Sequence, residues 1–378
     1  MILKEGLIKD VKEGFWKTKL NSNLNYNYNY GSILGLCLAI QIITGIILSG
    51  YYIGDFIKSY SSVERIMREI IGGWEIRYIH SVNATLFFLI TYAHIFRSLY
   101  YNTNSGSRVV VFRYGIIILI LLITSAFLGY ILPNGNMSYW AGSIITNLIT
   151  AIPYLGEYLL KNIIGGFGIC NSTIGRFFAI HYLLPLIISA LILLHIMELH
   201  RKGGSNILGV RAMIGEITFD PYYSRKDLFG YICYMILLGY IIKYMPEAFP
   251  FGDIDNNNEA NIVITPSKII PHIYLLWTYG ILRSINSKLG GIILMGGGLG
   301  IWFVEHLFEF GLRRNRISDK KLKWILISII LILTWLGTRI IEYPITIIGK
   351  CAIIGYFSLF IIKSILGLFD NLSYWVNK

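Results

Sequence analysis

Residues 73–80 read GWEIRYIH, and an apolar run then leads to His94, fourteen residues after His80. The same interval recurs later in the chain, where RFFAIH at residues 176–181 leads through a second apolar run from His181 to His195. Fourteen residues make almost four turns of an α-helix and a rise of about 21 Å. Both histidines of each pair therefore share one helix face, at two depths.

A single histidine inside an apolar helix is more often a core residue than a ligand. Ionisable side chains within membrane spans are costly, however, and usually serve a function. Two pairs with one shared interval therefore favour a functional interpretation of all four histidines.

The composition is that of a membrane protein. Of 378 residues, 55% are hydrophobic and 14% charged, with a mean hydropathy of +0.60, whereas soluble proteins average about one quarter charged residues. A helix needs about 20 apolar residues to cross the hydrocarbon core. The sequence predicts an all-α polytopic membrane protein with eight transmembrane helices, at about residues 31–53, 75–101, 109–133, 173–199, 227–246, 288–307, 322–341 and 346–367.

The net charge of +12 comes from basic residues that gather in particular loops, which argues against a nucleic-acid partner. They are most frequent within residues 4–19, 201–226 and 313–323, which are alternate loops on one side of the membrane. The opposite side has few basic residues. The positive-inside rule therefore places both termini on the negative (N) side and the intervening loops on the positive (P) side.

This topology aligns the histidines in depth. His80 and His181 lie near the P face, and His94 and His195 near the N face. Each matched pair can place two imidazoles on opposite sides of one iron, which leaves no open coordination position and suits electron transfer. Because the four cysteines form no C-x-x-C-H motif, we expect two non-covalent b-type haems in a bundle of the first four spans.

Glycines and arginines at matching depths extend this prediction. Glycine allows a flat ring to approach the backbone, and the first and third spans each hold two glycines fourteen residues apart: Gly31 and Gly115 at the N-side depth, Gly45 and Gly129 at the P-side depth. Haem propionates pair with guanidinium groups, for which the candidates are Arg77 and Arg176 on the P side and Arg97 and Arg108 on the N side. Helix packing by glycine and interface snorkelling by arginine are the alternatives.

At these residues the chain resembles cytochrome b, the di-haem core subunit of the mitochondrial cytochrome bc1 complex, over nearly its full length. Besides the histidines, the resemblance rests on GSILG at 31–35, QIITG at 41–45, FLGY at 127–130, ITNL at 145–148 and ILRSI at 281–285. It implies that quinol is oxidised near the P face and ubiquinone is reduced near the N face, with an electron path through two b haems and coupling to proton translocation.

The resemblance also implies partners and a location. A Rieske iron–sulfur protein, cytochrome c1, accessory complex III subunits and a second copy of this chain would complete the complex. It would lie among membrane lipids in the mitochondrial inner membrane, with both termini on the matrix side. The chain then divides into an N-side amphipathic arm (1–29), a haem-binding four-helix bundle (30–210) and a C-terminal four-helix region that completes the P-side quinol pocket (211–378).

In the family, a histidine after the fourth span and an aspartate before the fifth form the N-side quinone pocket, and His200 and Asp227 match them. Ser205, Asn206, Lys226 and Asn29 lie nearby in the predicted topology. Reduction of a quinone needs two protons, which such groups can relay from the aqueous side. The alternative is the ordinary polarity of loop ends.

The P-side pocket should lie between residues 129–148 and 271–285, with a wall that includes Ile145, Leu275 and Tyr279. The family usually has Pro-Glu-Trp-Tyr where this chain reads PHIY at 271–274, and the glutamate is credited with accepting a proton from quinol. Histidine titrates near neutral pH, so His272 is a candidate catalytic base, aided by Tyr274. Alternatively, His272 is a tolerated residue at the rim, and water or another subunit takes the proton.

The chain departs from the family at three more places. PNGNMS at 133–138 replaces a version that contains Trp and Gln, the loop 247–268 is divergent, and Ala141 stands where glycine is common. The extra Cβ of Ala141 should narrow the pocket and weaken the binding of bulky P-side inhibitors. Two other functions stay open: a di-haem membrane anchor of another quinone-linked dehydrogenase, and a histidine-containing metal or proton transporter.

Overall fold

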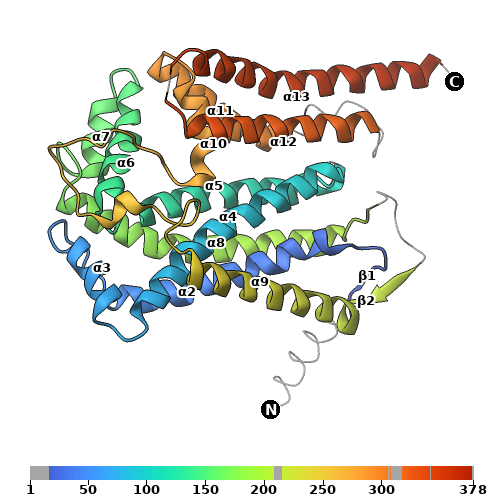
Figure 1. Cartoon of the computed structure of the whole chain (residues 1–378). Helices are drawn as coiled ribbons and strands as arrows, with labels where there is room; N and C mark the ends of the chain where they lie inside the picture. The colour runs from blue at the N-terminus through green and yellow to red at the C-terminus, as the bar shows by residue number, and fades with distance from the viewer. Residues whose placement is uncertain are drawn as a thin grey trace.

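A computed structural model describes residues 17–104, 106–207, 215–304, 307, 317–340 and 342–376. Eight long helices occupy the segments predicted as spans: α2 (Tyr30–Ser49), α4 (Gly73–Tyr100), α5 (Val109–Ile131), α8 (Asn171–Lys202), α9 (Ser224–Tyr244), α11 (Lys288–Val304), α12 (Ile317–Gly337) and α13 (Ile345–Val376). Figure 1 shows them running side by side. Apolar segments take this form because a helix satisfies its own backbone hydrogen bonds where lipid supplies none.

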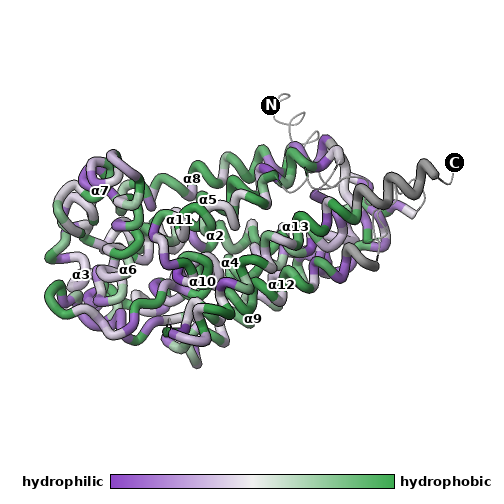
Figure 2. Tube along the Cα trace, turned by 90° about the horizontal axis from the view of Figure 1, so that it is seen from above, coloured by the Kyte–Doolittle hydropathy of each residue, from purple (hydrophilic) through white to green (hydrophobic). Residues whose placement is uncertain are grey.

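Six of these helices, α2, α4, α5, α8, α9 and α13, are long and apolar enough to cross a membrane. α11 has only 17 residues, and three lysines, Lys320, Lys321 and Lys323, fall near the start of α12. Figure 2 shows hydrophobic residues along the long helices and hydrophilic ones toward both ends. The chain is therefore a multi-spanning helical membrane protein, and the full set of eight crossings stays a prediction.

The first four long helices form a closed bundle. α2 packs against α4 and α5 against α8, and contacts between α4 and α5 and between α2 and α8 complete the ring. α10 (Leu276–Arg283) packs against α12, and α9 packs against α2 and α4. One apolar core, which includes Cys37 of α2 and Phe360 of α13, joins the bundle to the C-terminal helices.

Short elements gather at the two ends of the long helices. α3 (Ser59–Arg68), α6 (Asn136–Asn147) and α7 (Gly156–Ile164) lie at the predicted P-side end (Figure 1). At the opposite end, β1 (Lys19–Asn21) pairs antiparallel with β2 (Glu216–Thr218). This small sheet is an exception to the all-α prediction and ties the N-side arm to the segment before α9.

Parts of the predicted N-side surface lie outside the described residues. These are residues 1–16 of the arm, Arg211, and the basic residues at 313, 314 and 316. The division of the chain at residue 210 also stays a prediction.

Candidate functional site

The P-side histidines, His80 on α4 and His181 on α8, meet across the bundle. Their ring centroids lie 6.3 Å apart, with the planes at 79°. A histidine nitrogen binds a first-row metal at about 2 Å, so two imidazoles on opposite sides of one iron have centroids roughly 6 Å apart. The spacing of this pair therefore fits bis-histidine ligation of a single iron.

Hydrogen bonds at Nδ1 orient both P-side imidazoles. His181 Nδ1 donates to the Ser125 carbonyl oxygen at 2.8 Å. His80 Nδ1 lies 2.9 Å from Thr44 Oγ1. Because the Thr44 hydroxyl donates to the Ile40 carbonyl at 2.6 Å, it accepts from His80. Metal-ligating histidines usually donate their other ring N–H in this way, and the arrangement leaves Nε2 of both rings for a metal.

The N-side histidines lie at the second depth of the same two helices. His94 on α4 and His195 on α8 are close enough to interact electrostatically. The guanidinium of Arg97, one turn further along α4, places Nη2 3.3 Å from His94 Nδ1. α4 and α8 thus each carry one member of both pairs.

Each of the four predicted glycines lies beside one of the four histidines. The gaps from an added glycine Cβ to the histidine Cε1 are 3.6 Å for Gly31 and His94, 3.5 Å for Gly115 and His195, 3.3 Å for Gly45 and His80, and 2.6 Å for Gly129 and His181. The pairs match the depths predicted from the helix directions. At Gly129 in particular, the histidine ring leaves no room for a side chain.

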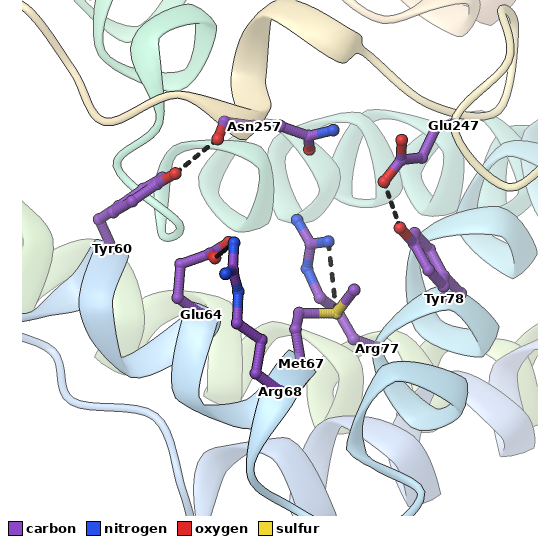
Figure 3. Close-up of polar contacts among 8 residues, drawn as sticks. All are labelled: Tyr60, Glu64, Met67, Arg68, Arg77, Tyr78, Glu247 and Asn257. Atoms are coloured by element: carbon purple, nitrogen blue, oxygen red, sulfur yellow. Dashed lines mark hydrogen bonds and ion pairs between the residues drawn. The ribbon is translucent and has the colours of Figure 1, made fainter.

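Two arginines lie where they can hold an anion. Arg77 on α4 donates to Met67 Sδ on α3 at 3.6 Å (Figure 3), and because a thioether is a weak acceptor, the guanidinium keeps the capacity to bind a carboxylate. Arg97 lies 4.8 Å over the ring of Tyr28. Its Nε is buried and has no hydrogen-bond partner within the described residues. The histidines, glycines and Arg77 on the P side fit a haem, and the same residue types recur at the N-side depth.

The other two arginines satisfy carbonyls at helix ends. Arg176 donates to the Asn162 carbonyl at 2.6 Å, in the last turn of α7. Arg108 donates to the carbonyls of Gly203 and Gly204, just after α8, at 3.2 Å and 2.8 Å. The last carbonyls of a helix have no partner within it, so these contacts stabilise both helix ends. A propionate role for Arg176 or Arg108 stays a prediction.

A cavity of about 340 Å³ extends from the P-side histidines to the loop after α9. Its lining is mainly apolar and comes from all four bundle helices. His80 and His181 border it together with His272, Tyr130 and Tyr274. The candidate haem site and the candidate base His272 therefore border one cavity.

His272 lies just before the short helix η7 (Ile273–Leu275). Its ring stacks on that of Tyr274, with centroids 4.8 Å apart, and lies perpendicular to the ring of Tyr130, with centroids 5.8 Å apart. The Nδ1 atom is buried and has no hydrogen-bond partner in the part of the chain that the structure describes. Burial lowers the pKa of His272 to about 4, so the imidazole is neutral near pH 7 and can accept a hydrogen bond or a proton.

Two carboxylates in the divergent loop 247–268 also border this cavity. Tyr130 Oη donates to Asp253 Oδ2 at 2.8 Å, and burial raises the pKa of Asp253. Nearer α4, the hydroxyl of Tyr78 donates to Glu247 (Figure 3). Neither carboxylate was predicted as a site residue, because periodicity does not show where a loop folds back.

The predicted pocket wall does not border this cavity. Ala141 is only 2% exposed within α6, and Leu275 packs against the main apolar core. The Tyr279 hydroxyl donates to the Ile269 carbonyl at 3.3 Å. The roles of these three residues and of Ile145 in quinol binding stay predictions.

On the N side, three polar residues meet between α2 and α9. Asp227 Oδ1 accepts hydrogen bonds from Asn29 Nδ2 and from Ser32 Oγ, both at 2.7 Å. Ser32 was not predicted, although it follows Asn29 by about one helical turn on the same face. The structure therefore joins two of the predicted N-side residues and adds a hydroxyl.

The remaining N-side candidates have other neighbours. Lys226 Nζ donates to the Leu24 carbonyl at 2.6 Å, which holds the arm against α9. Ser205 lies near the hydroxyl of Tyr28, whose ring is under Arg97. His200 lies exposed near the end of α8. Their part in quinone binding stays a prediction.

The fold and the histidines define a class: helical membrane proteins in which a four-helix bundle carries paired histidines at two depths. Family models described as cytochrome b/b6/petB and cytochrome b(C-terminal)/b6/petD match residues 15–203 and 259–357. The chain belongs to the cytochrome b family, which implies b-type haem binding. It is also similar to a solved chain of a "Hyperthermophilic respiratory Complex III", with 28% identity, 98% of each chain covered and a TM-score of 0.92.

Proposed function

We propose that this chain is the di-haem electron-transfer core subunit of a quinol–cytochrome c oxidoreductase and that it crosses the membrane eight times. The observation that carries the proposal is the His80–His181 pair, 6.3 Å apart and bordering the same cavity as His272. His80 and His181 would hold the P-side haem, and His94 and His195 the N-side haem. When bound, the two haems carry electrons between the membrane faces.

On the P side, the chain's own residues take one of the two protons that quinol releases, and the other passes to water or to another subunit. Oxidation of a quinol yields two electrons and two protons. His272 accepts one quinol proton at Nδ1, which is buried and without a partner among the described residues, and the Tyr130–Asp253 pair leads away from it. General-base catalysis requires an unprotonated acceptor within hydrogen-bond reach of the substrate.

On the N side, Asp227 is the candidate acid for the predicted quinone. Its hydrogen bonds from Asn29 and Ser32 fix the carboxylate at the start of α2. We assign it, with His200, to the delivery of the two protons that quinone reduction requires.

The similarity to a respiratory complex III chain supports assembly into a larger complex. The partners we propose are a Rieske iron–sulfur protein, cytochrome c1, accessory subunits and a second copy of this chain. We place the complex in the mitochondrial inner membrane, with both termini on the matrix side and ubiquinone as substrate.

Reduced-minus-oxidised optical spectra of the purified complex test the proposal. Two b-type components that quinol reduces, and that respond to separate P-side and N-side inhibitors, are expected. Two b-type components without the P-side response would indicate a di-haem anchor of another dehydrogenase. A protein without haem bands would exclude the proposal and leave transport as the function to test.

A further inference from the structure

Asn256 connects the loop after α9 to a helix 118 residues earlier in the chain. Its Oδ1 accepts a hydrogen bond from the backbone N–H of Ser138 at 2.7 Å, and its Nδ2 donates to Ser138 Oγ at 2.9 Å. Ser138 is the third residue of α6, where the backbone N–H has no acceptor within the helix. Asn256 therefore supplies an N-terminal cap, a role usually taken by a side chain at the start of the helix itself.

The residue that precedes α6 cannot supply this N-terminal cap. Gly135 precedes the helix and has no side chain to cap it. A Cβ on Gly135 would lie 2.2 Å from the Asn256 carbonyl oxygen and 2.5 Å from Asn256 Oδ1. A larger residue at position 135 would therefore displace the loop.

Neighbouring contacts make the connection specific. Asn136 N donates to the Asn258 carbonyl at 2.8 Å, and Trp140 Nε1 donates to the Asn261 carbonyl at 3.0 Å. The two segments that depart from the family pattern, 133–138 and 247–268, are thus bound to each other.

Asn256 also borders the cavity that holds His272. Its backbone N–H donates to the Asp253 carbonyl at 3.1 Å, so both residues belong to one tight turn. Ser138 Oγ donates in addition to the Tyr130 carbonyl at 2.6 Å. One side chain therefore sets the position of α6 relative to both members of the Tyr130–Asp253 pair.

We propose that Asn256 is a positioning residue for quinol oxidation: by capping α6 from the opposite segment, it fixes the P-side wall of the cavity around the substrate. This inference rests on the proposed function. It assigns Asn256 an effect on quinol binding at the P side and none on the N-side reaction.

The test uses the whole purified complex with Asn256→Ala, Asn256→Asp and Asn258→Ala. The alanine at 256 removes the cap, whereas aspartate keeps an oxygen acceptor for the Ser138 N–H. Asn258→Ala is the matched control, because Asn258 is exposed and contributes its backbone carbonyl to α6. Haem b content, kcat and KM for quinol, P-side inhibitor affinity and N-side haem reduction are measured for each variant.

We expect Asn256→Ala to keep both haems and the N-side reaction while KM for quinol rises and P-side inhibitor affinity falls, each by roughly five- to tenfold. Asn256→Asp should stay within about threefold of the wild type, as should Asn258→Ala. Wild-type KM in a fully loaded Asn256→Ala complex would overturn the inference, as would an aspartate variant no better than alanine.

If the Asn256→Ala complex does not assemble, the Asn256→Asp complex tests the proposal. A KM near that of the wild type supports the cap, and a KM raised as far as tenfold refutes it. Failure of the proposed function is distinguishable, because the wild-type complex would then show no turnover of quinol at all.

Discussion

Tyr130 donates a 2.8 Å hydrogen bond to Asp253, and its ring lies perpendicular to that of His272, with centroids 5.8 Å apart. A buried imidazole, a phenol and a carboxylate whose pKa is raised by burial therefore lie in one row beside the cavity. The family's glutamate is absent from position 272, and these three groups border the cavity in its place.

The pH profile of quinol oxidation should identify the acceptor. Because burial lowers the pKa of His272 to about 4, the imidazole is unprotonated between pH 5 and 8. The rate of quinol oxidation should fall only as the pH approaches about 4, where the imidazole becomes protonated and can no longer accept a proton. In His272→Glu the same burial raises the carboxyl pKa above its ordinary value of about 4.3. The acid limb of that variant should move to higher pH.

Cytochrome c reduction by quinol, followed from pH 5 to 8 in both complexes, measures this difference. His272→Ala serves as the reference without an acceptor and should lose at least about tenfold in rate. If His272→Ala kept the wild-type rate and pH dependence, His272 would be a rim residue and the base would have to be sought elsewhere.

Thr44 should lower the midpoint potential of the P-side haem through its hydrogen bond with His80. The Thr44 hydroxyl accepts from His80 Nδ1 at 2.9 Å, and an acceptor at this position makes an imidazole a stronger electron donor to its metal. Thr44→Val keeps the shape and removes the acceptor, so the midpoint potential should rise, by on the order of 60 mV, a tenfold change for one electron. Redox titration of the haem absorbance measures it, with Thr44→Ser as the control. Equal potentials in the valine and serine variants would contradict the role.

Gly129 should be required for the P-side haem. A Cβ at this position would lie 2.6 Å from His181 Cε1, and overpacking of this kind costs about 1–3 kcal/mol. Gly129→Ala should therefore lower the P-side spectral component by about tenfold or more and leave the N-side component in place. Gly35→Ala is the control, because nothing lies within 4 Å of its added Cβ. Normal haem content in Gly129→Ala would mean that the ring is not held against this backbone.

Helix geometry explains which parts of the site the sequence can predict. The rise per residue is fixed, so an interval of fourteen gives depth, and the structure places Gly45 beside His80 and Gly129 beside His181. The Ser125 carbonyl that accepts the hydrogen bond from His181 is a backbone group, so the residue type at 125 does not predict it. Thr44 could have been predicted, since it is the polar residue next to Gly45.

Helix geometry does not predict how a loop packs against a distant helix. The cap that Asn256 places on Ser138 joins residues 118 positions apart, and no periodicity relates a loop to the helix it meets. The same reason explains Asp253, which reaches Tyr130 only because its turn is held against α6. Ala141 was placed in the pocket wall from its position in the family motif; the structure buries it within α6 at 2% exposure, and its role stays a prediction.

Asp227 should be needed for N-side quinone reduction alone. Its Oδ1 accepts from both Asn29 and Ser32 at 2.7 Å. In Asp227→Asn the amide can meet both donors only through its single oxygen, and the group can no longer deliver a proton, so N-side turnover should fall by about a hundredfold. Both haems and the P-side reaction should be unchanged.

The measurement is haem b reduction by quinol through the N side, with the P side blocked by an inhibitor. Asp220→Asn is the matched control, since Asp220 is an exposed aspartate near the same end of α9 that bonds Ser224. An Asp227→Asn complex that reduced its haem at the rate of this control would show that the carboxylate stabilises the start of α2 and α9 without handling protons. The relay would then have to start from His200.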